Sequence, residues 1–531
     1  MDQWDGIVIG AGHNGLTCAA YLARAGLKIA VVERNDWIGG GTTTAEVTLP
    51  GFRHNLHANY FIGFDAAPVY RDLELERFGF RFVVPPVQNA WLFRDGRALV
   101  IHQDLDLTCA SIGRFSERDA AAFRVLYHRY AVAMRPLFVS LLYSPPLAPG
   151  ELRERLQGPW ADELLACAPL AFYDVIDRYF EDEHLRVLFK TLLHVITADN
   201  VPGTGLLFPT IMAGFTRLAL PLGGAASFPR ALARIVEATG GAVITGRQVE
   251  QIVVRGGEAR GVALSDGSRL EAKRFVASAV VFPQTVRLVG EEAFEGPIRE
   301  KARSWKWNAH TLTTLHLALD EPPRYRAADF DPAVERAYNV FFGADDTADL
   351  EQSLADIARG QFPNGPVGNG CCNTLFDPSY APPGKHIAFW WPFAGYEIDG
   401  RASTWDDRRR EYAERLLEVW RSYAPNLTAD NVLASYLFTP LDVERRNLNM
   451  VRGSVRGGAY HPDQLGTNRP HPALAQYRTP LPGLYVCGPS AANGGGVNSA
   501  PGYNAAGIIA DDLKLDRWWS PMPAPAWEGQ S

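Results

Sequence analysis

Residues 6–15 read Gly6-Ile7-Val8-Ile9-Gly10-Ala11-Gly12-His13-Asn14-Gly15, and this stretch decides how the N-terminal part of the chain folds. Its apolar half predicts a buried strand, and the Ala- and Leu-rich residues 16–25 predict a helix after the glycine turn. A second apolar run at residues 28–32 completes a strand–helix–strand unit. Glycines at such a turn let a pyrophosphate approach the free N–H groups of the helix N-terminus. The stretch therefore predicts a Rossmann-type dinucleotide-binding unit.

An acidic residue stands where such a unit binds ribose. Glu33 follows Gly15 by 18 residues, and a carboxylate at that point accepts hydrogen bonds from the ribose hydroxyls of an adenosine. The neighbouring Arg34 would suit a 2′-phosphate, but the acid disfavours NADP. Glycines 39–41 and Thr42 follow, and they leave room for a bulky ligand, although a surface loop would have the same composition.

The end of the chain returns to the same architecture. Residues 483–488 predict a strand, residues 494–497 a glycine loop and residues 505–513 a helix. A protein that binds only a nicotinamide cofactor has no need of such a distant closing element, so the two termini together favour FAD. A helix that starts near residues 501–505 would direct its N-terminal dipole at the loop and stabilise an anionic reduced flavin ring there.

The composition excludes several other classes of protein. Of the 531 residues, 59 are acidic and 52 are basic, which gives a net charge of −7 and no cationic stripe for nucleic acid. The cysteines include no C-x-x-C pair, so we expect neither a redox disulfide nor a metal site. We expect reduced, mostly buried thiols at Cys18, Cys109, Cys167, Cys371, Cys372 and Cys487.

The first strand begins within a few residues of the N-terminus and leaves no room for a signal peptide, so we expect a cytoplasmic protein. The most apolar stretches, residues 138–147 and 201–215, are shorter than the ~20 residues of a membrane-spanning helix. Peripheral contact with a membrane and a homodimer both stay open. Trp518, Trp519 and Trp527 would either anchor at a lipid interface or pack against a partner protein, and packing is the favoured interpretation.

The pattern changes several times between the two termini. Residues 117–139, 160–180 and 184–196 predict helices separated by Pro and Gly, and strands return between residues 242 and 279. Alternating strands and a long amphipathic helix at residues 405–423 predict a further mixed unit. We therefore expect an α/β protein in five segments: Rossmann-type FAD-binding parts at residues 1–100, 221–300 and 471–531, a helical cap at 101–220, and an interleaved mixed-sheet substrate domain at 301–470.

Several motifs are similar to those of one family of flavoproteins. They are Val8-Ile9-Gly10-Ala11-Gly12-His13-Asn14-Gly15-Leu16, Ile38-Gly39-Gly40-Gly41, Pro50-Gly51-Phe52, residues 376–386, and Gly494-Gly495-Gly496-Val497 through to Ala506. With them the chain resembles the phytoene desaturase-related flavoproteins, in the branch of the cyanobacterial-type β-carotene ketolases and pyridine nucleotide-disulphide oxidoreductase domain-containing protein 2. The resemblance implies a glutathione reductase- or amine oxidase-like FAD-binding fold.

The resemblance also implies which residues bind FAD. The ADP and ribityl parts would be held by Gly10, Gly12, Gly15, Glu33, Gly40 and Gly41. Val249 would meet the adenine through its backbone, and the isoalloxazine ring would be bordered by Gly488, Gly495, Gly496 and Val497. The predicted set also includes His13, Asn14, Arg34 and Thr42. The chain departs from its relatives at Tyr503 and at Ala492-Asn493, and these changes bear on a long carotenoid substrate more than on the cofactor.

Oxidation by a flavin needs few acid or base groups, because the substrate C–H has only to be positioned against flavin N5. We name His57 and His461 as candidate catalytic residues because imidazoles titrate near neutral pH, although hydrogen-bonded or surface histidines are more common. The aromatic residues 389–393 would line a substrate channel or, as is more common, form the core of a strand.

The leading hypothesis is an FAD-dependent oxidoreductase of the desaturase or oxidase type. It would act on CH–CH or allylic positions of a small apolar, isoprenoid or carotenoid-like substrate, with O₂ or a quinone as electron acceptor. The alternative is an isomerase or hydratase that uses reduced flavin without net redox turnover. A flavoprotein with no catalytic activity is a third hypothesis, although a scaffold has no need of the glycine loop at residues 494–497.

Overall fold

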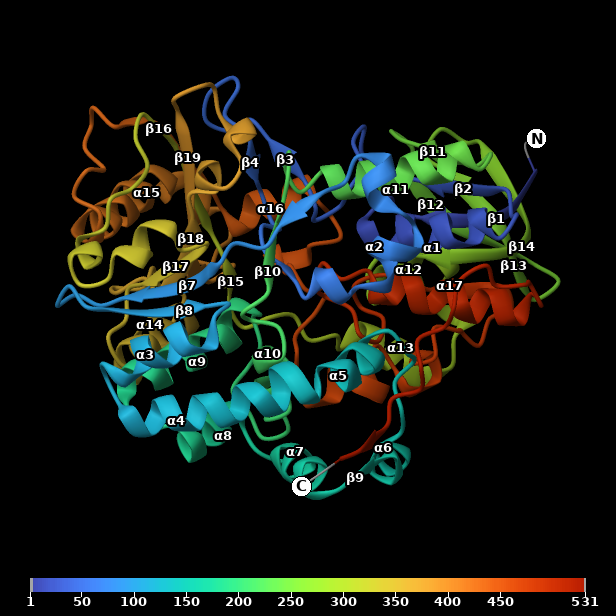
Figure 1. Cartoon of the computed structure of the whole chain (residues 1–531). Helices are drawn as coiled ribbons and strands as arrows, with labels where there is room; N and C mark the ends of the chain where they lie inside the picture. The colour runs from blue at the N-terminus through green and yellow to red at the C-terminus, as the bar shows by residue number, and fades with distance from the viewer. Residues whose placement is uncertain (1–2, 530–531) are drawn as a thin grey trace.

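The computed structural model describes residues 3–529, and Figure 1 shows two lobes with a layer of helices across one side. The first lobe is built on a seven-stranded sheet of order β11-β2-β1-β14-β13-β12, with β21 beside β14. Strands from three distant parts of the chain thus meet in one sheet. These strands are β1 (Gln3–Ile9), β2 (Ile29–Val32), β11 (Ala242–Ile244), β12 (Val249–Arg255), β13 (Glu258–Leu264), β14 (Arg269–Ser278) and β21 (Leu484–Val486).

Helix α1 (His13–Arg24) is buried along almost its whole length. It lies in contact with the sheet, with α11 (Ser227–Ala238) and with α17 (Ala500–Asp512). A Cβ atom on Gly502 would lie 2.1 Å from the carbonyl oxygen of Asn14, so only glycine permits this close approach of α17. The contact brings the end of the chain against the predicted pyrophosphate turn.

The second lobe holds an eight-stranded sheet of order β20-β16-β19-β18-β17-β7-β8, in which β15 pairs with β19. Its strands are β7 (Val87–Leu92), β8 (Ala98–His102), β15 (Thr311–Leu312), β16 (Thr314–Leu319), β17 (Asn339–Phe342), β18 (Gly368–Cys371), β19 (His386–Ala394) and β20 (Val432–Phe438). The expected boundary at residue 100 needs correction. Because β7 pairs in parallel with β17, residues 87–102 belong to this sheet.

Aromatic residues of β19 face two separate cores. Trp390 is buried on one side with α15 (Thr404–Tyr423), whereas Phe389 and Trp391 pack on the other side against Tyr60. The remaining α-helices outside the helical layer are α2 (Pro68–Asp72), α12 (Phe282–Val289), α13 (Gly296–Arg303), α14 (Thr347–Ala358) and α16 (Pro440–Arg446). The short strands are β3 (Thr44–Ala45), β4 (His54–Asn55), β5 (Phe61–Ile62), β6 (Phe82–Val83) and β10 (Leu218–Pro221), together with β9 (Leu156–Gln157) and β22 (Trp527–Glu528), which pair beside the helical layer.

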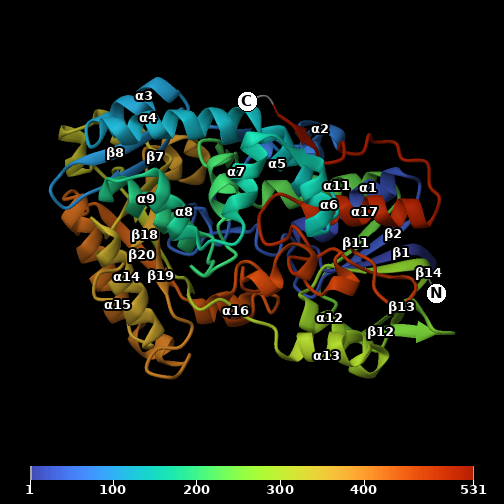
Figure 2. The same ribbon diagram turned by 90° about the horizontal axis from the view of Figure 1, so that it is seen from below.

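The helical layer packs against the second sheet at one end and extends past it toward the first lobe at the other (Figure 2). Its helices are α3 (Leu105–Gly113), α4 (Glu117–Leu126), α5 (Arg135–Leu142), α6 (Pro149–Arg155), α7 (Pro159–Cys167), α8 (Phe172–Tyr179), α9 (Glu183–Val195) and α10 (Leu207–Met212). A π-helical segment, Tyr127–Ala133, interrupts the single helix expected at residues 117–139. The helix expected at residues 160–180 is likewise divided, because Pro169 cannot donate a backbone hydrogen bond.

The C-terminal tryptophans pack within the chain itself. The ring of Trp519 lies 4.9 Å from that of Tyr21, and Trp518 Nε1 donates to the Tyr21 carbonyl at 3.0 Å. Trp527 stacks on Trp160, where β22 pairs with β9. Within residues 3–529 no helix is both long and apolar enough to cross a membrane. All six cysteines lie in this part of the chain, and each is buried.

Candidate functional site

A cavity of about 520 Å³ lies where the two lobes meet. Its walls come from the β1–α1 turn, the end of β2, the start of β12, α12, the loop after α16 and the segment before α17. Most of the predicted cofactor-binding residues line it: Gly10, Gly12, His13, Asn14, Gly15, Glu33, Arg34, Gly40, Gly41, Val249, Gly495, Gly496 and Val497.

Thr42 and Gly488, the other two predicted residues, stand behind this wall. The buried Thr42 Oγ1 donates to the Gly39 carbonyl at 2.6 Å and so braces the turn that presents Gly40. A Cβ atom on Gly488 would lie 2.6 Å from the carbonyl oxygen of Ala279, so glycine is needed for close packing there. In the structure both residues shape the cavity without lining it.

The turn between β1 and α1 has the conformation that an approaching phosphate requires. Gly10 has a φ of +96°, which favours glycine, and a Cβ atom on Gly15 would lie 2.2 Å from the Gly10 carbonyl oxygen. The buried side chain of Asn14 lines the cavity, and its Oδ1 has no hydrogen-bond partner within the chain. A polar ligand in the cavity would supply that partner.

Glu33 is held in place from both sides. Its carboxylate accepts hydrogen bonds from Ala11 N at 2.9 Å and from Asn35 N at 2.9 Å. A carboxylate has further lone pairs, so it can also accept from ribose hydroxyls. The neighbouring Arg34 donates to Asn35 Oδ1 at 2.8 Å and to the Arg446 carbonyl at 3.4 Å. Arg34 is thus engaged within the protein.

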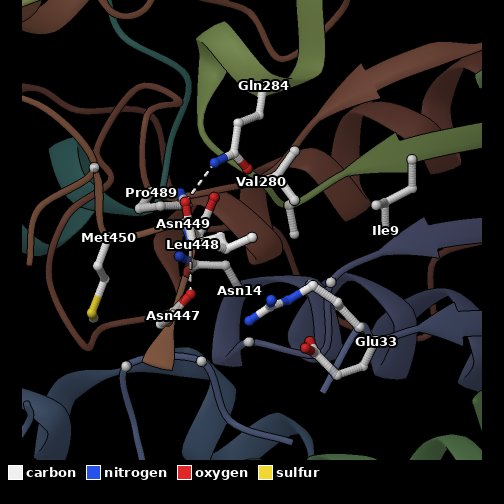
Figure 3. A pocket seen from close by; sticks show the side chains of 18 of the residues that line it. Ile9, Asn14, Glu33, Val280, Gln284, Asn447, Leu448, Asn449, Met450 and Pro489 are labelled. Carbon is white, nitrogen blue, oxygen red and sulfur yellow. Dashed lines mark hydrogen bonds between the residues drawn. The ribbon is translucent and has the colours of Figure 1, made fainter. Parts of the chain in front are cut away.

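One wall of the cavity, the loop Asn447–Met450 after α16, was not expected from any sequence motif (Figure 3). Gln284 Nε2 donates to the Leu448 carbonyl, and Asn449 Oδ1 accepts from Val281 N, both at short distances of 2.5 and 2.6 Å. These bonds join a loop of the second lobe to α12 of the first. Only the tertiary fold brings this loop to the cavity.

The charged residues of the lining gather at one end, which we call the Glu33 end. Glu33 and Arg34 lie there at the end of β2, and Glu250 and Arg287 lie on β12 and α12, which pack together. The opposite walls, which we call the triplet end, are formed by His57, Ala58, Met450, Val455, Gly495, Gly496 and Val497. Among the described residues, no carboxylate, lysine or arginine lines the triplet end.

The structure brings only one of the two candidate catalytic histidines to the cavity. His57 lines it, and its Nε2 is buried with no partner. Burial, with a smaller effect of the Arg446 charge, lowers the pKa of His57 to about 3, so this imidazole is neutral at pH 7. His461 lies outside the lining in a half-exposed cluster with Asp463 and Lys306.

The two departures from the family pattern have structural partners. Asn493 Nδ2 donates to the carbonyls of Leu142 and Ser144 at 2.9 and 2.8 Å, so it ties the end of α5 to the loop before α17. Tyr503 packs edge-on against Tyr21 and also against Tyr143, the residue that follows α5, and it lies outside the lining. The substitutions therefore join the helical layer to the first lobe.

These residues fit FAD. The Glu33 end offers a ribose acceptor, the β1–α1 turn offers backbone N–H groups, and the Asn14 amide lacks a partner. A Cβ atom on Gly40 would lie 3.2 Å from Gly12 Cα, and one on Gly41 would lie 2.7 Å from Met450 Cε, so glycines keep the middle of the cavity open. An FAD molecule with its adenosine at the Glu33 end would place its ring at the triplet end.

Comparison with known proteins identifies the class. Residues 15–506 match the family described as flavin containing amine oxidoreductase, and the chain belongs to this family. It is 33% identical to one of the subunits of limonene dehydrogenase from Castellaniella defragrans, over 98% of this chain and 97% of that protein. It is 29% identical to pyridine nucleotide-disulfide oxidoreductase domain-containing protein 2 of Rattus norvegicus, over 96% and 94% of the two chains.

The fold has counterparts among solved structures. A putrescine oxidase variant superposes with a TM-score of 0.62 at 16% identity, over 96% of this chain and 99% of that one. The matches confirm the predicted family, the amine oxidase-like α/β fold and FAD as the cofactor. The protein is an FAD-dependent oxidoreductase.

Proposed function

We propose that the protein is an FAD-dependent dehydrogenase that oxidises a neutral, apolar substrate of the terpenoid class at an allylic or CH–CH position. One observation carries the proposal, namely that no charged side chain lines the triplet end of the cavity among the described residues. An amine is a cation at neutral pH, and burying a cation without a partner is costly. The uncharged walls around His57, Ala58 and Met450 favour a hydrocarbon instead.

The relatives support the same substrate class. The limonene dehydrogenase chain carries the name of a hydrocarbon substrate, and its similarity spans nearly the whole of both chains. Its name also describes it as one subunit among others, so a partner chain belongs to the proposal together with O₂ or a quinone as acceptor.

Bound FAD would supply the two-electron acceptor, and the chain would supply position and a dry site. The neutral His57 would offer a hydrogen bond at the triplet end, since its low pKa makes it a poor store for a proton. The loop Asn447–Met450 would keep water from the cofactor by closing the cavity from the second lobe.

The test is to mix the FAD-loaded protein without oxygen with limonene, with phytoene and with putrescine, and to follow the visible absorbance of the flavin. We expect a hydrocarbon to bleach the flavin and putrescine to leave it unchanged. Bleaching by putrescine alone would overturn the proposal. If no compound bleaches the flavin, but a dithionite-reduced sample converts an alkene, the protein is an isomerase or hydratase instead.

A further inference from the structure

Three consecutive carbonyl groups before α17 are each bound by a different side chain. Tyr460 OH donates to the Gly494 carbonyl at 2.7 Å, Arg456 Nη1 donates to the Gly495 carbonyl at 2.8 Å, and His13 Nε2 lies 3.1 Å from the Gly496 carbonyl. We call these residues the carbonyl clamp. The clamp fixes the orientation of all three peptide groups.

The amide groups of the same segment are free. Within residues 3–529, the N–H groups of Gly495, Gly496 and Val497 have no acceptor in the chain, and these three residues line the cavity. Fixed carbonyls on one side and free N–H groups on the other form a preorganised site for negative charge.

Two guanidinium groups lie directly behind this segment. Arg469 is fully buried, and Nη2 donates to the carbonyls of Arg456 and Pro489 at 2.9 and 3.0 Å. Both guanidinium carbons lie within 6 Å of the Tyr460 ring centre, at 5.9 Å for Arg456 and 5.3 Å for Arg469. In the described part of the chain, neither Arg456 nor Arg469 has a carboxylate within 4.0 Å, so their charges are not neutralised by an ion pair.

Arg469 keeps its positive charge at neutral pH. Burial lowers the pKa of Arg469 to about 10, which still leaves it protonated at pH 7. Arg456 Nε is buried without a partner, so part of its donor capacity is unused within the chain. A buried unpaired charge is costly and is kept at functional sites where it stabilises charge on a ligand.

We propose that Arg456 and Arg469, acting through the carbonyl clamp, stabilise negative charge on the reduced flavin ring and so raise its two-electron potential. This inference rests on the proposed function only for the presence and orientation of FAD. Bound FAD would accept a hydride from the substrate, that is two electrons and one proton, and the ring would then carry a negative charge. The substrate cation left behind would release its adjacent proton to water. The clamp would make the ring a better acceptor for the poorly reactive C–H bond of a hydrocarbon.

Sulfite tests the proposal without any substrate. It forms a bond from sulfur to flavin N5 with its own lone pair, and the ring takes up the negative charge. We expect the FAD-loaded protein to bind sulfite, and Arg456→Met to weaken that binding about tenfold. The same change should lower the equilibrium constant for reduction about tenfold, which is about 30 mV for a two-electron couple.

Two matched variants separate charge from structure. Arg456→Lys keeps the charge and should retain most of the sulfite affinity and potential. Arg452→Met removes a charge four residues away, where Arg452 pairs with Glu397 at 2.8 Å, and should change neither quantity. If Arg456→Met loses FAD, Tyr460→Phe takes its place, because it releases the Gly494 carbonyl and should weaken sulfite binding by a smaller factor.

The outcomes separate this inference from the proposed function. The inference is wrong if Arg456→Met binds sulfite with the affinity of the wild type and has the wild-type flavin potential. The same holds for Tyr460→Phe if that variant is used instead. FAD binding and the proposed hydrocarbon substrate would not be affected by such a result. Equal losses of sulfite affinity in Arg456→Met and Arg456→Lys would also overturn the inference, because the positive charge of residue 456 would then not be the cause. A protein that binds no FAD would contradict both this inference and the proposed function. If sulfite binds as expected but no hydrocarbon is oxidised, only the proposed substrate class is wrong.

Discussion

The Nε2 atom of His13 lies 3.1 Å from the carbonyl oxygen of Gly496, although 483 residues separate them in the sequence. The acceptor is a carbonyl, so Nε2 carries the proton. Burial lowers the pKa of His13 to about 4, and the ring therefore stays neutral at pH 7 and keeps Nδ1 unprotonated. This contact joins the first residue of α1 to the triplet end of the cavity.

Replacing His13 by Ala should weaken FAD binding. A single hydrogen bond contributes about 1 kcal/mol, which is about fivefold in Kd. We expect about a fivefold higher Kd because the Gly496 carbonyl would lose the side chain that holds it, one of the three in the carbonyl clamp. Titration of the apoprotein with FAD, followed by fluorescence, measures the effect. The exposed His128 provides the control, and His128→Ala should bind FAD like the wild type. Equal Kd values for both variants would contradict the role of His13.

Gly15→Ala should impair both stability and FAD content. The new Cβ atom would lie 2.2 Å from the Gly10 carbonyl oxygen and 2.9 Å from Ala279 Cβ, and such overpacking costs about 1–3 kcal/mol. Gly150→Ala in α6 is the matched change, because nothing lies within 4 Å of its Cβ position. Thermal unfolding with a flavin assay should show a lower Tm and less FAD for Gly15→Ala alone. A Gly15→Ala protein with full FAD content would show that the turn tolerates a side chain.

Local pattern was enough to predict the elements that begin the site. The apolar run before Gly10 forms β1. Helix α1 begins at His13, directly after Gly12 and three residues before the helix expected at residues 16–25. The spacing from Gly15 alone was enough to select Glu33 as the predicted ribose-binding acid, and Glu33 lines the cavity. Such features depend on residues close in sequence, and the sequence shows them directly.

The parts that were not predicted depend on distant contacts. The membership of β7 in the second sheet follows from its pairing with β17, and nothing within residues 87–92 specifies that partner. The loop Asn447–Met450 lines the cavity and is bound there by Gln284 and Val281, which lie more than 150 residues away in the sequence. Nothing in the sequence favoured His57 over His461 as a candidate catalytic residue. The structure distinguishes them, because His57 is buried and His461 lies in a half-exposed cluster.

His57 and His461 offer a matched pair for function. His57→Phe keeps a ring against Phe438, whose centre lies 5.3 Å away, but removes the buried hydrogen-bonding atoms. We expect about tenfold slower flavin reduction by substrate, because such a group contributes about 1–2 kcal/mol. His461→Phe, outside the cavity, should leave the rate unchanged.

The pH profile gives a second test of His57. With a pKa of about 3, this histidine should produce no inflection in the rate of flavin reduction near neutral pH. Stopped-flow measurement of both variants over a pH series checks the prediction. An inflection near pH 6.5 that disappears in His57→Phe would show that the site charges this histidine.

Buried histidines should make the fold sensitive to mild acid. Burial lowers the pKa of His54 and His57 to about 3, and it also lowers the pKa values of His194, His310 and His316. In the unfolded chain each would titrate near pH 6.5. Below that pH the unfolded chain binds more protons than the folded chain, so the free energy of unfolding falls as pH falls.

The expected loss of stability follows from the difference between the folded and unfolded pKa values. His54 and His57, with folded-state pKa values of about 3, should each cost about 1 kcal/mol of stability between pH 6.5 and pH 5.5. These losses are a sizeable part of the roughly 5–15 kcal/mol that stabilises a domain. Denaturant unfolding at the two pH values should show His54→Gln losing about 1 kcal/mol less than the wild type, whatever its stability at pH 7. His128→Gln, at an exposed position, should keep the wild-type difference. A wild-type protein equally stable at both pH values would mean that these imidazoles take up protons without unfolding.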